Sequence, residues 1–559
     1  MKNSILNFFK IYKAPLIVFF VAGSLGALIF IAIFGVGVIN PTYVQWIQAD
    51  NGDLSQHYIG WLFYRNSPWS PTLGSISSLA YPHGLALTFT DSIPLFAIPF
   101  KLLSPLLPST FQYFGLWGVF SYAMMGGIGG LILRQLTKNV PFAILGSLVF
   151  SMSPIVIQRM FSHTALAGHW VILAGIFLLV RFSKASRLPI FITWWSVVLI
   201  LATCVHPYFL PMAFALLLMS AVLTFKKPKD LILRVVIPFF AAVCVFAWIG
   251  GFVVTDVVTD GARDFGLNVN TLINSMGWSD FLQSPKELKN GYEAFAYLGL
   301  GMILLAGVAL YTLISTAPKF SKKKVVTRIK SFIHSRMLIV CLIGLAVLIA
   351  AVSPTLNIGT YQFAFYLPNH IERIWSIFRA TGRLFWPLYY LLVVGLLYVI
   401  YKKLRPKVSL AVLLVFFVLF IGVQTWDIYE SPNTQAKHVR FIDEKVTYET
   451  HVDEAKWASL AKNKNHIQYI GGVDTKAFFS IAYFATDHGL TMSDGYYARS
   501  PQKAIDKASL QAKGDILSGH ARSDTIYITK DQTVLDYAAN ASNLSIIEDQ
   551  GSNIIVVKE

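Results

Sequence analysis

Residues 16–38 read LIVFFVAGSLGALIFIAIFGVGV, and this segment decides the fold class. It contains no charged residue and exceeds the ~20 residues that an α-helix needs to cross the hydrocarbon core of a bilayer. Basic residues precede it, as in a signal peptide, but the apolar run is too long for a signal-peptide core and no small-residue cleavage site follows. We therefore predict a first transmembrane helix that is retained in the protein.

The rest of the chain repeats this pattern. Of its 559 residues, 55% are hydrophobic and only 13% are charged, whereas soluble globular proteins carry about 25% charged residues. Recurring apolar runs predict a polytopic α-helical membrane protein with about eleven transmembrane helices. The predicted spans are Leu16–Val38, Phe114–Leu133, Pro141–Ile157, Ala165–Val180, Ile190–Val205, Tyr208–Phe225, Leu231–Val254, Ala294–Ile314, Met337–Val352, Leu384–Tyr401 and Val408–Val423.

The basic residues indicate the orientation of these spans. The net charge of +17 does not point to nucleic acid, because Lys and Arg concentrate in short loops between apolar runs. We exclude Ser92–Pro108 from the spans, since it contains four prolines and Lys101, and place it as an interfacial or re-entrant segment. All strongly basic short loops then share one side with the N-terminus, which predicts a cytoplasmic N-terminus. These loops contain Arg134 and Lys138; Arg181, Lys184 and Arg187; Lys226, Lys227 and Lys229; the lysines and arginine of residues 319–330; and Lys402, Lys403, Arg405 and Lys407.

The predicted topology divides the chain into a transmembrane domain, residues 1–426, and a C-terminal domain, residues 427–559. Residues 39–110 form a long first loop outside the membrane, with juxtamembrane helices. Strand and helix patterns alternate in the C-terminal residues, which predicts a small extracytoplasmic α/β domain. The strand patterns are HIQYIGG (466–472), TIYITKD (525–531), LSIIED (544–549) and NIIVVKE (553–559), and the helix patterns are EAKWASLAKN (454–463) and TKAFFSIAYFATDHG (475–489).

The first loop carries candidate acid–base groups. Residues 50–69 read DNGDLSQHYIGWLFYRNSPW and place Asp50 and Asp53 before an amphipathic helical pattern. Aspartate is a preferred N-cap residue, so helix capping and a catalytic role are both open for Asp50 and Asp53. His57 lies one helical turn after Asp53 and either lines the same site or lies at the membrane interface. Asp91, in TFTDSIPL (88–95), adds a second carboxylate on the same side.

The segment FRATGRLFWP (378–387) carries candidate phosphate ligands. On a helix, the spacing of Arg379 and Arg383 places both guanidinium groups on one face. A pair of guanidinium groups suits phosphate recognition, and Arg373 lies close enough in sequence to join them. The alternative is that these arginines extend toward lipid headgroups. We favour phosphate binding, because the positive-inside rule makes arginine the less expected residue outside the membrane.

Histidines and aromatic residues give secondary candidates on this side. His163 and His169, in FSHTALAGHW (161–170), are six residues apart, a spacing that disfavours a shared metal on one helix face. His163 and His206 either line the site or are structural, as lone loop histidines more often are. In the C-terminal domain, MSDGYYAR (492–499) is the densest polar and aromatic stretch and a candidate glycan contact.

A carboxylate base together with arginines that hold a phosphate is what transfer from a lipid phosphate requires. The order of one helix, a long acidic first loop, many helices and a soluble domain resembles the GT-C superfamily of polytopic membrane glycosyltransferases. Residues 52–69 (GDLSQHYIGWLFYRNSPW), residues 81–101 (YPHGLALTFTDSIPLFAIPFK) and FRATGRLFWP also resemble an uncharacterised bacterial membrane-protein family within that superfamily.

The resemblance implies an inverting glycosyltransferase in the bacterial plasma membrane. Its donor would be a polyprenyl-phosphate-linked sugar, and its acceptor an extracytoplasmic cell-surface glycan or a lipid-linked molecule. By resemblance the general base falls on Asp53 or Asp50, and Arg379 and Arg383 take the donor phosphate. Some members add a divalent metal, Mg or Mn, for which Asp91 and Glu372 are the candidate ligands, although the chain has no DxD-type pair at Asp50–Asp53.

Two other classes of protein compete with this hypothesis. One is a transporter or flippase for lipid-linked glycans, and the other is a non-catalytic protein of cell-wall polymer assembly. Transporters usually carry ionisable residues inside their spans, near the bilayer midplane. This chain keeps them at the loop ends, which favours the glycosyltransferase.

Overall fold

The computed structural model divides the chain into two compact units. Unit 1 comprises Met1–Ile39, Phe114–Val243 and Val258–Phe441, and unit 2 comprises Asn40–Tyr113, Cys244–Val257 and Ile442–Glu559. The structure describes residues 2–182, 187–254, 263–286, 291–316, 327, 330–429, 448–473, 475–497, 499–549 and 551–558.

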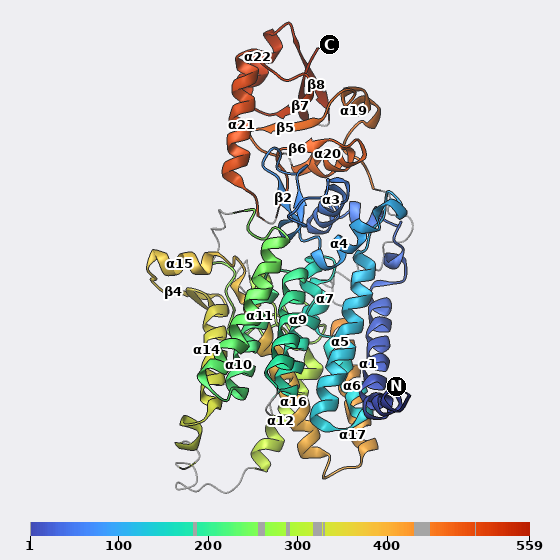
Figure 1. Ribbon diagram of the computed structural model, residues 1–559, viewed down its shortest axis with the longest axis vertical. Helices are drawn as coiled ribbons and strands as arrows, with labels where there is room; N and C mark the ends of the chain where they lie inside the picture. The colour runs from blue at the N-terminus through green and yellow to red at the C-terminus, as the bar shows by residue number, and fades with distance from the viewer. Residues whose placement is uncertain are drawn as a thin grey trace. The chain divides into compact units, whose positions relative to one another are not determined.

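Unit 1 is a bundle of apolar helices (Figure 1). Apolar runs form helices in a bilayer because a helix satisfies its own backbone polar groups. Its elements are α1 (Lys2–Phe34), η1 (Gly37–Ile39), α5 (Phe114–Thr137), α6 (Val140–Ser151), α7 (Pro154–Arg159), η4 (Thr164–Ala167), α8 (Trp170–Arg181), α9 (Leu188–Val205), α10 (Phe209–Thr224), α11 (Pro228–Trp248, whose end lies in unit 2), η5 (Gly291–Ala294), α12 (Leu300–Ser315), α14 (Arg336–Val352), β3 (Thr355–Ile358), β4 (Tyr361–Ala364), α15 (Asn369–Ser376), η6 (Thr381–Phe385), α16 (Trp386–Leu404) and α17 (Leu410–Tyr429).

Each of the eleven predicted spans overlaps one of these helices, and seven helices are long and apolar enough to cross a membrane. The membrane-protein class therefore agrees with the structure, while the count of eleven crossings stays a prediction. The seven are Lys13–Phe34, Phe114–Thr137, Thr164–Arg181, Leu188–Val205, Pro228–Trp248, Thr381–Leu404 and Leu410–Tyr429, and the shorter apolar helices are Val140–Ser151, Phe209–Thr224, Leu300–Ser315 and Arg336–Val352.

Most predicted spans differ somewhat from the observed helices in their bounds, and Pro141–Ile157 and Ala294–Ile314 include residues that are not α-helical. The run Pro141–Ile157 is interrupted: α6 ends at Ser151 and α7 begins at Pro154, where proline suits a first helical turn. The run Ala294–Ile314 becomes helical only from Leu300, after Gly299 adopts a φ of +84°. Both interruptions place polar backbone and side chains next to the apolar helices, and one of them contributes to the candidate site.

Glycines allow α1 to pack tightly on α5. A Cβ atom on Gly26 would lie 2.2 Å from the carbonyl oxygen of Tyr122, and one on Gly126 would lie 2.2 Å from that of Ala22. Small residues at helix contacts let two backbones approach closely, as in membrane helix pairs. Larger side chains at these positions would separate the two helices.

Unit 2 combines the first loop with the C-terminal residues. The first loop contains α2 (Gln45–Gln48), α3 (Asp53–Asn66), β1 (Ser75–Ile76), β2 (Leu85–Ala86), η2 (Leu87–Phe89), α4 (Pro94–Leu102) and η3 (Ser104–Leu106). The C-terminal part contains α19 (Glu454–Leu460), β5 (His466–Ile470), α20 (Thr475–Asp487), β6 (Thr491–Met492), α21 (Gln502–Leu517), β7 (Thr525–Thr529), α22 (Gln532–Asn540), β8 (Leu544–Asp549) and β9 (Ser552–Val557).

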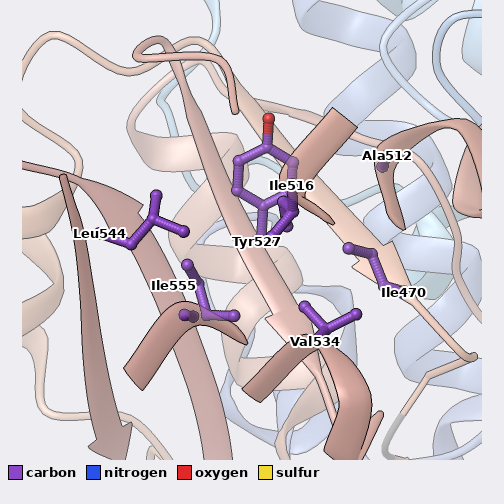
Figure 2. Close-up of a cluster of buried hydrophobic side chains, with 8 residues drawn as sticks. Ile470, Ala512, Ile516, Tyr527, Val534, Leu544 and Ile555 are labelled. Atoms are coloured by element: carbon purple, nitrogen blue, oxygen red, sulfur yellow. The ribbon is translucent and has the colours of Figure 1, made fainter. Parts of the chain in front are cut away.

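The predicted C-terminal α/β region is confirmed. Its five strands have the order β6-β5-β7-β9-β8, with β6, β5 and β7 parallel and β9 antiparallel to both neighbours. All four predicted strand patterns and both predicted helix patterns coincide with elements of this region. Its core is formed by buried apolar residues of the sheet and of α21 and α22 (Figure 2): Ile470, Ala512, Ile516, Tyr527, Val534, Ala538, Leu544 and Ile555.

The first loop is an ordered part of the same unit as this sheet. The backbone N–H of Met492 donates to the carbonyl of Ser78 at 2.8 Å, and the N–H of Tyr81 donates to the carbonyl of Met492 at 2.9 Å. The rings of Tyr58 on α3 and Tyr483 on α20 lie 6.1 Å apart. The sequence-based division at residues 426/427 assigns the first loop to the transmembrane domain, whereas the structure groups this loop with the C-terminal residues.

The segment Ser92–Pro108 contains only one short α-helix. The nine residues of α4 rise about 14 Å, less than half of a ~30 Å hydrocarbon core. Its exclusion from the spans is therefore consistent with its length.

Candidate functional site

Three buried charged residues meet in unit 1, and we call Arg159, Glu293 and Arg383 the Arg–Glu cluster. Nη1 of Arg159 donates to Oε2 of Glu293 at 3.0 Å. Nε and Nη2 of Arg383 donate to the same oxygen at 3.0 and 2.5 Å. Arg159 also donates through Nη2 to the carbonyl of Glu293 at 2.9 Å. One carboxylate therefore joins two guanidinium groups from distant parts of the chain.

The cluster lies where apolar helices begin or end. Arg159 is the last residue of α7, Glu293 lies in η5 before α12, and Arg383 lies in η6 directly before α16. The N-terminus of α16, with its partial positive charge, lies three residues after Arg383, and the C-terminus of α7, with its partial negative charge, lies at Arg159.

The cluster is ionised at neutral pH. Burial alone would raise the pKa of Glu293, but the guanidinium of Arg383 and then that of Arg159 hold it well below its usual range. Burial lowers the pKa of Arg159 to about 10, which leaves this guanidinium charged. Glu293 thus compensates one of the two buried positive charges, and the cluster retains a net positive charge.

Further groups surround the cluster in unit 1. Nε2 of His163 lies 3.9 Å from Oε1 of Glu293. Arg379 is exposed, and its guanidinium lies 4.8 Å from the centre of the Phe265 ring. Burial raises the pKa of the Tyr292 hydroxyl above its usual value, Glu293 adds to this increase, and the guanidinium groups of Arg379, Arg159 and Arg383 offset part of it. Tyr292 therefore lies within electrostatic reach of all three arginines.

His206 supports the cluster indirectly. Its Nδ1 accepts a hydrogen bond from the backbone N–H of Tyr208 at 3.1 Å. The Tyr208 ring lies 5.0 Å from the guanidinium carbon of Arg383, and its hydroxyl accepts from the N–H of Ala380 at 2.9 Å. His206 thus orients a ring that packs on Arg383.

The helical spacing predicted for Arg379 and Arg383 is wrong. Arg379 lies in a bend, and η6 begins only at Thr381. The backbone N–H of Gly382 donates to the carbonyl of Phe265 at 3.0 Å, and a Cβ atom there would lie 2.4 Å from Cβ of Ala294. Gly382 thus leaves room for η6 to pack against Ala294; Arg383 pairs with Glu293, while Arg379 is exposed beside Phe265. Arg373 is exposed on α15.

The predicted acid–base residues lie in unit 2. Asp53 is the first residue of α3, and Oδ2 of Asp50 accepts a hydrogen bond from the backbone N–H of Leu54 at 3.2 Å. Asp50 therefore caps this helix, and the capping interpretation of Asp53 is wrong. Instead, Oδ1 of Asp53 accepts a hydrogen bond from the hydroxyl of Tyr496 at 3.0 Å. Tyr496 belongs to the segment 492–499 that the sequence marked as a candidate glycan contact.

His57 and Asp91, both predicted site residues, form a pair in unit 2. Nε2 of His57 lies 3.8 Å from Oδ2 of Asp91, and both side chains are largely buried. The hydroxyl of Ser92 donates to the carbonyl of His57 at 2.7 Å. The pair connects α3 with the segment before α4, and the role of both residues in the site stays a prediction.

Asp91 and Glu372, the metal-ligand candidates from the sequence, each lie beside another side chain. Asp91 lies in unit 2 beside His57, whereas Glu372 lies in unit 1, where Nε of Arg263 donates to it at 2.6 Å. Within the described ranges, no group of three or more His, Cys, Asp and Glu residues is placed to hold a metal ion.

Comparison with known families assigns the chain to a family. The family model "Domain of unknown function (DUF6311)" matches residues 23–429, and the model "DUF6311 C-terminal domain" matches residues 456–556. The chain belongs to the DUF6311 family. No curated protein matches it.

In this DUF6311 chain, sequence reasoning missed Arg159 and Glu293. Arg159 follows a predicted span on the side that the predicted topology places outside, where the positive-inside rule makes arginine unexpected; the same signal selected Arg383. Glu293 directly precedes the predicted span at Ala294. An arginine and a glutamate at the ends of two apolar runs on one side are candidates for a buried ion pair.

Proposed function

We propose that the protein is a GT-C-type, inverting glycosyltransferase. It moves a sugar from a polyprenyl-phosphate donor to an extracytoplasmic cell-surface glycan or lipid-linked acceptor. The observation that supports this most is the Arg–Glu cluster, in which buried guanidinium groups adjoin the exposed Arg379 at the ends of apolar helices. A lipid phosphate combines an apolar chain with an anion, and this combination of groups suits both parts.

In the proposed reaction, the arginines have different tasks. Arg379 is exposed, and its planar guanidinium can donate two parallel hydrogen bonds to the phosphate. Arg159 and Arg383 are held by Glu293 and supply a fixed positive charge. As the bond between the sugar and the phosphate breaks, negative charge grows on the departing phosphate, and fixed positive charge stabilises it.

Asp53 is the proposed general base. The acceptor hydroxyl attacks the anomeric carbon, its proton passes to the Asp53 carboxylate, and the sugar–phosphate bond breaks with its electron pair leaving on the phosphate. The hydroxyl of Tyr496 holds one oxygen of Asp53, which fixes the orientation of the carboxylate. Asp50 is the weaker candidate, because it is engaged in capping α3.

The proposed location is the bacterial plasma membrane, with the N-terminus in the cytoplasm and the C-terminal domain outside. We expect a cysteine at Ser459 to react with a membrane-impermeant maleimide in whole cells. A cysteine at Ser409, beside the basic loop 402–407, should react only after permeabilisation. Both serines are exposed and lie on either side of α17. Labelling of both from the same side would contradict the proposed crossing by α17.

We expect Arg379→Ala to lower the rate of sugar transfer by about 10- to 100-fold. This is the effect of losing one hydrogen bond to a charged group, which contributes ~1.5–3 kcal/mol. Arg379→Lys should recover little of this rate, because lysine keeps the charge but loses the planar fork. The measurement is transfer from a polyprenyl-phosphate sugar in proteoliposomes, at varied donor concentrations.

The matched control is Arg405→Ala, which removes another exposed arginine from the basic loop at the opposite end of α16. It should transfer sugar at the wild-type rate. Wild-type kinetics for both Arg379 variants would remove the phosphate role from this residue.

A further inference from the structure

The hairpin of β3 and β4, with the residues that follow to Tyr366, has an unusual distribution of polarity; we call residues 355–366 the hairpin segment. β3 pairs with β4 in an antiparallel register from Thr355–Ala364 to Ile358–Tyr361. Exposed aromatic side chains line it: Tyr361 is 71% exposed and Tyr366 is 92% exposed. Ile358, Phe363 and Phe365 are exposed as well.

Two polar side chains of the hairpin segment, those of Thr355 and Asn357, point inward, whereas those of Thr360 and Gln362 are exposed. Thr355 and Asn357 are 1% and 2% exposed. The hydroxyl of Thr355 donates to the carbonyl of Arg263 at 2.8 Å, and Nδ2 of Asn357 donates to that of Gly266 at 3.3 Å. A hairpin that faced water would show the reverse arrangement, with apolar side chains inside and polar side chains outside.

The exposed apolar surface continues from a membrane helix. The hairpin segment follows α14 after two residues, and Figure 1 shows β4 beyond the end of α14. α14 is one of the shorter apolar helices, and it exposes Met337, Ile339, Leu342, Leu345 and Ile349. Residues 355–368 contain no charged side chain. The hairpin segment thus extends an apolar surface that has the composition of a lipid-facing one.

We propose that the hairpin segment is an interfacial anchor that inserts its aromatic side chains into the lipid headgroup region. Tyrosine suits this depth because its ring is apolar and its hydroxyl is polar. The depth is limited because β4, as one of the two strands of this sheet, pairs with β3 along one edge and has a second edge. Unpaired edge N–H and C=O groups are costly in hydrocarbon but are solvated among headgroups.

The test uses full-length protein in phosphatidylcholine–phosphatidylglycerol vesicles, with Cys204, Cys244 and Cys341 replaced by alanine. An environment-sensitive NBD label is attached to Tyr366→Cys, and in a second variant to Phe363→Cys. Quenching is measured with iodide in the water and with nitroxide-labelled lipid in the bilayer. Phe20→Cys on α1 serves as the lipid-facing control, and Leu510→Cys on α21 as the aqueous control; both side chains are well exposed.

We expect the labels at residues 363 and 366 to be quenched by the lipid nitroxide, as at residue 20, and to resist iodide compared with residue 510. Quenching by iodide as strong as at residue 510 would overturn the proposal, because the hairpin segment would then face water. Protection from both quenchers would also overturn it and would show that a protein surface, such as a second copy of the chain, covers the hairpin segment. This test needs no sugar transfer and is independent of the proposed function.

Discussion

Replacing Glu293 with glutamine is expected to lower the free energy of unfolding by about 3–5 kcal/mol. Removing one partner of a buried ion pair leaves the opposite charge uncompensated, and that loss has this magnitude. Here two buried guanidinium groups, those of Arg159 and Arg383, lose the same carboxylate oxygen. The measurement is the Tm of purified protein in detergent, compared with wild type at one scan rate.

Glu372→Gln is the matched control. It removes a carboxylate that also pairs with one arginine, Arg263, but in a far more exposed setting. Exposed ion pairs contribute little because water and salt screen them, so its Tm should stay close to that of wild type. Equal Tm values for the Glu293 and Glu372 variants would contradict a stabilising role for the Arg–Glu cluster.

The sign of the pH dependence gives an independent check. Because the pKa of Glu293 in the folded protein lies below its unfolded value of 4.5, its contribution to stability is fully present above pH 4.5. The contribution is lost progressively as the pH falls from there through the folded-state pKa. Glu293→Gln cannot titrate, so the difference in Tm between wild type and variant should shrink as the medium is acidified.

The elements of the fold were largely predictable from the sequence, because they depend on local patterns. Apolar runs located the helices of unit 1, and alternation located β5, β7, β8 and β9. The sequence did not predict the local backbone conformation where it depends on tertiary contacts. Arg379 lies in a bend and Arg383 in a 3-10 helix whose Gly382 packs against Ala294, and a spacing argument that assumes a regular α-helix cannot anticipate this.

The candidate site was less predictable for the same reason. Arg159, Glu293 and Arg383 come from three segments far apart in the chain, and only the fold brings their charges together. His57 and Asp91 were each selected as site residues, yet the structure pairs them in the interior of unit 2. Composition identifies residues that are costly to bury, but it does not say which of them compensate one another.

The proposed base gives the largest expected effect on activity. Asp53→Asn should lower the rate of sugar transfer by at least ~10²-fold, the low end of general-base contributions. Asparagine has nearly the size of aspartate, and its amide oxygen can still accept the hydrogen bond from Tyr496, but it cannot take a proton from the acceptor hydroxyl. Because Asp50 and not Asp53 caps α3, the substitution should leave the Tm unchanged, which separates a chemical loss from a folding loss.

Asp50→Asn distinguishes the two carboxylates. Asparagine caps helices about as well as aspartate, so this variant should fold like wild type. If Asp53 is the base, the Asp50 variant keeps most of its transfer rate while the Asp53 variant loses it. The reverse result would assign the base to Asp50. Wild-type rates for both variants would exclude a base in this loop and would favour a transporter or a non-catalytic assembly protein, since neither needs a group that accepts a proton from a sugar hydroxyl.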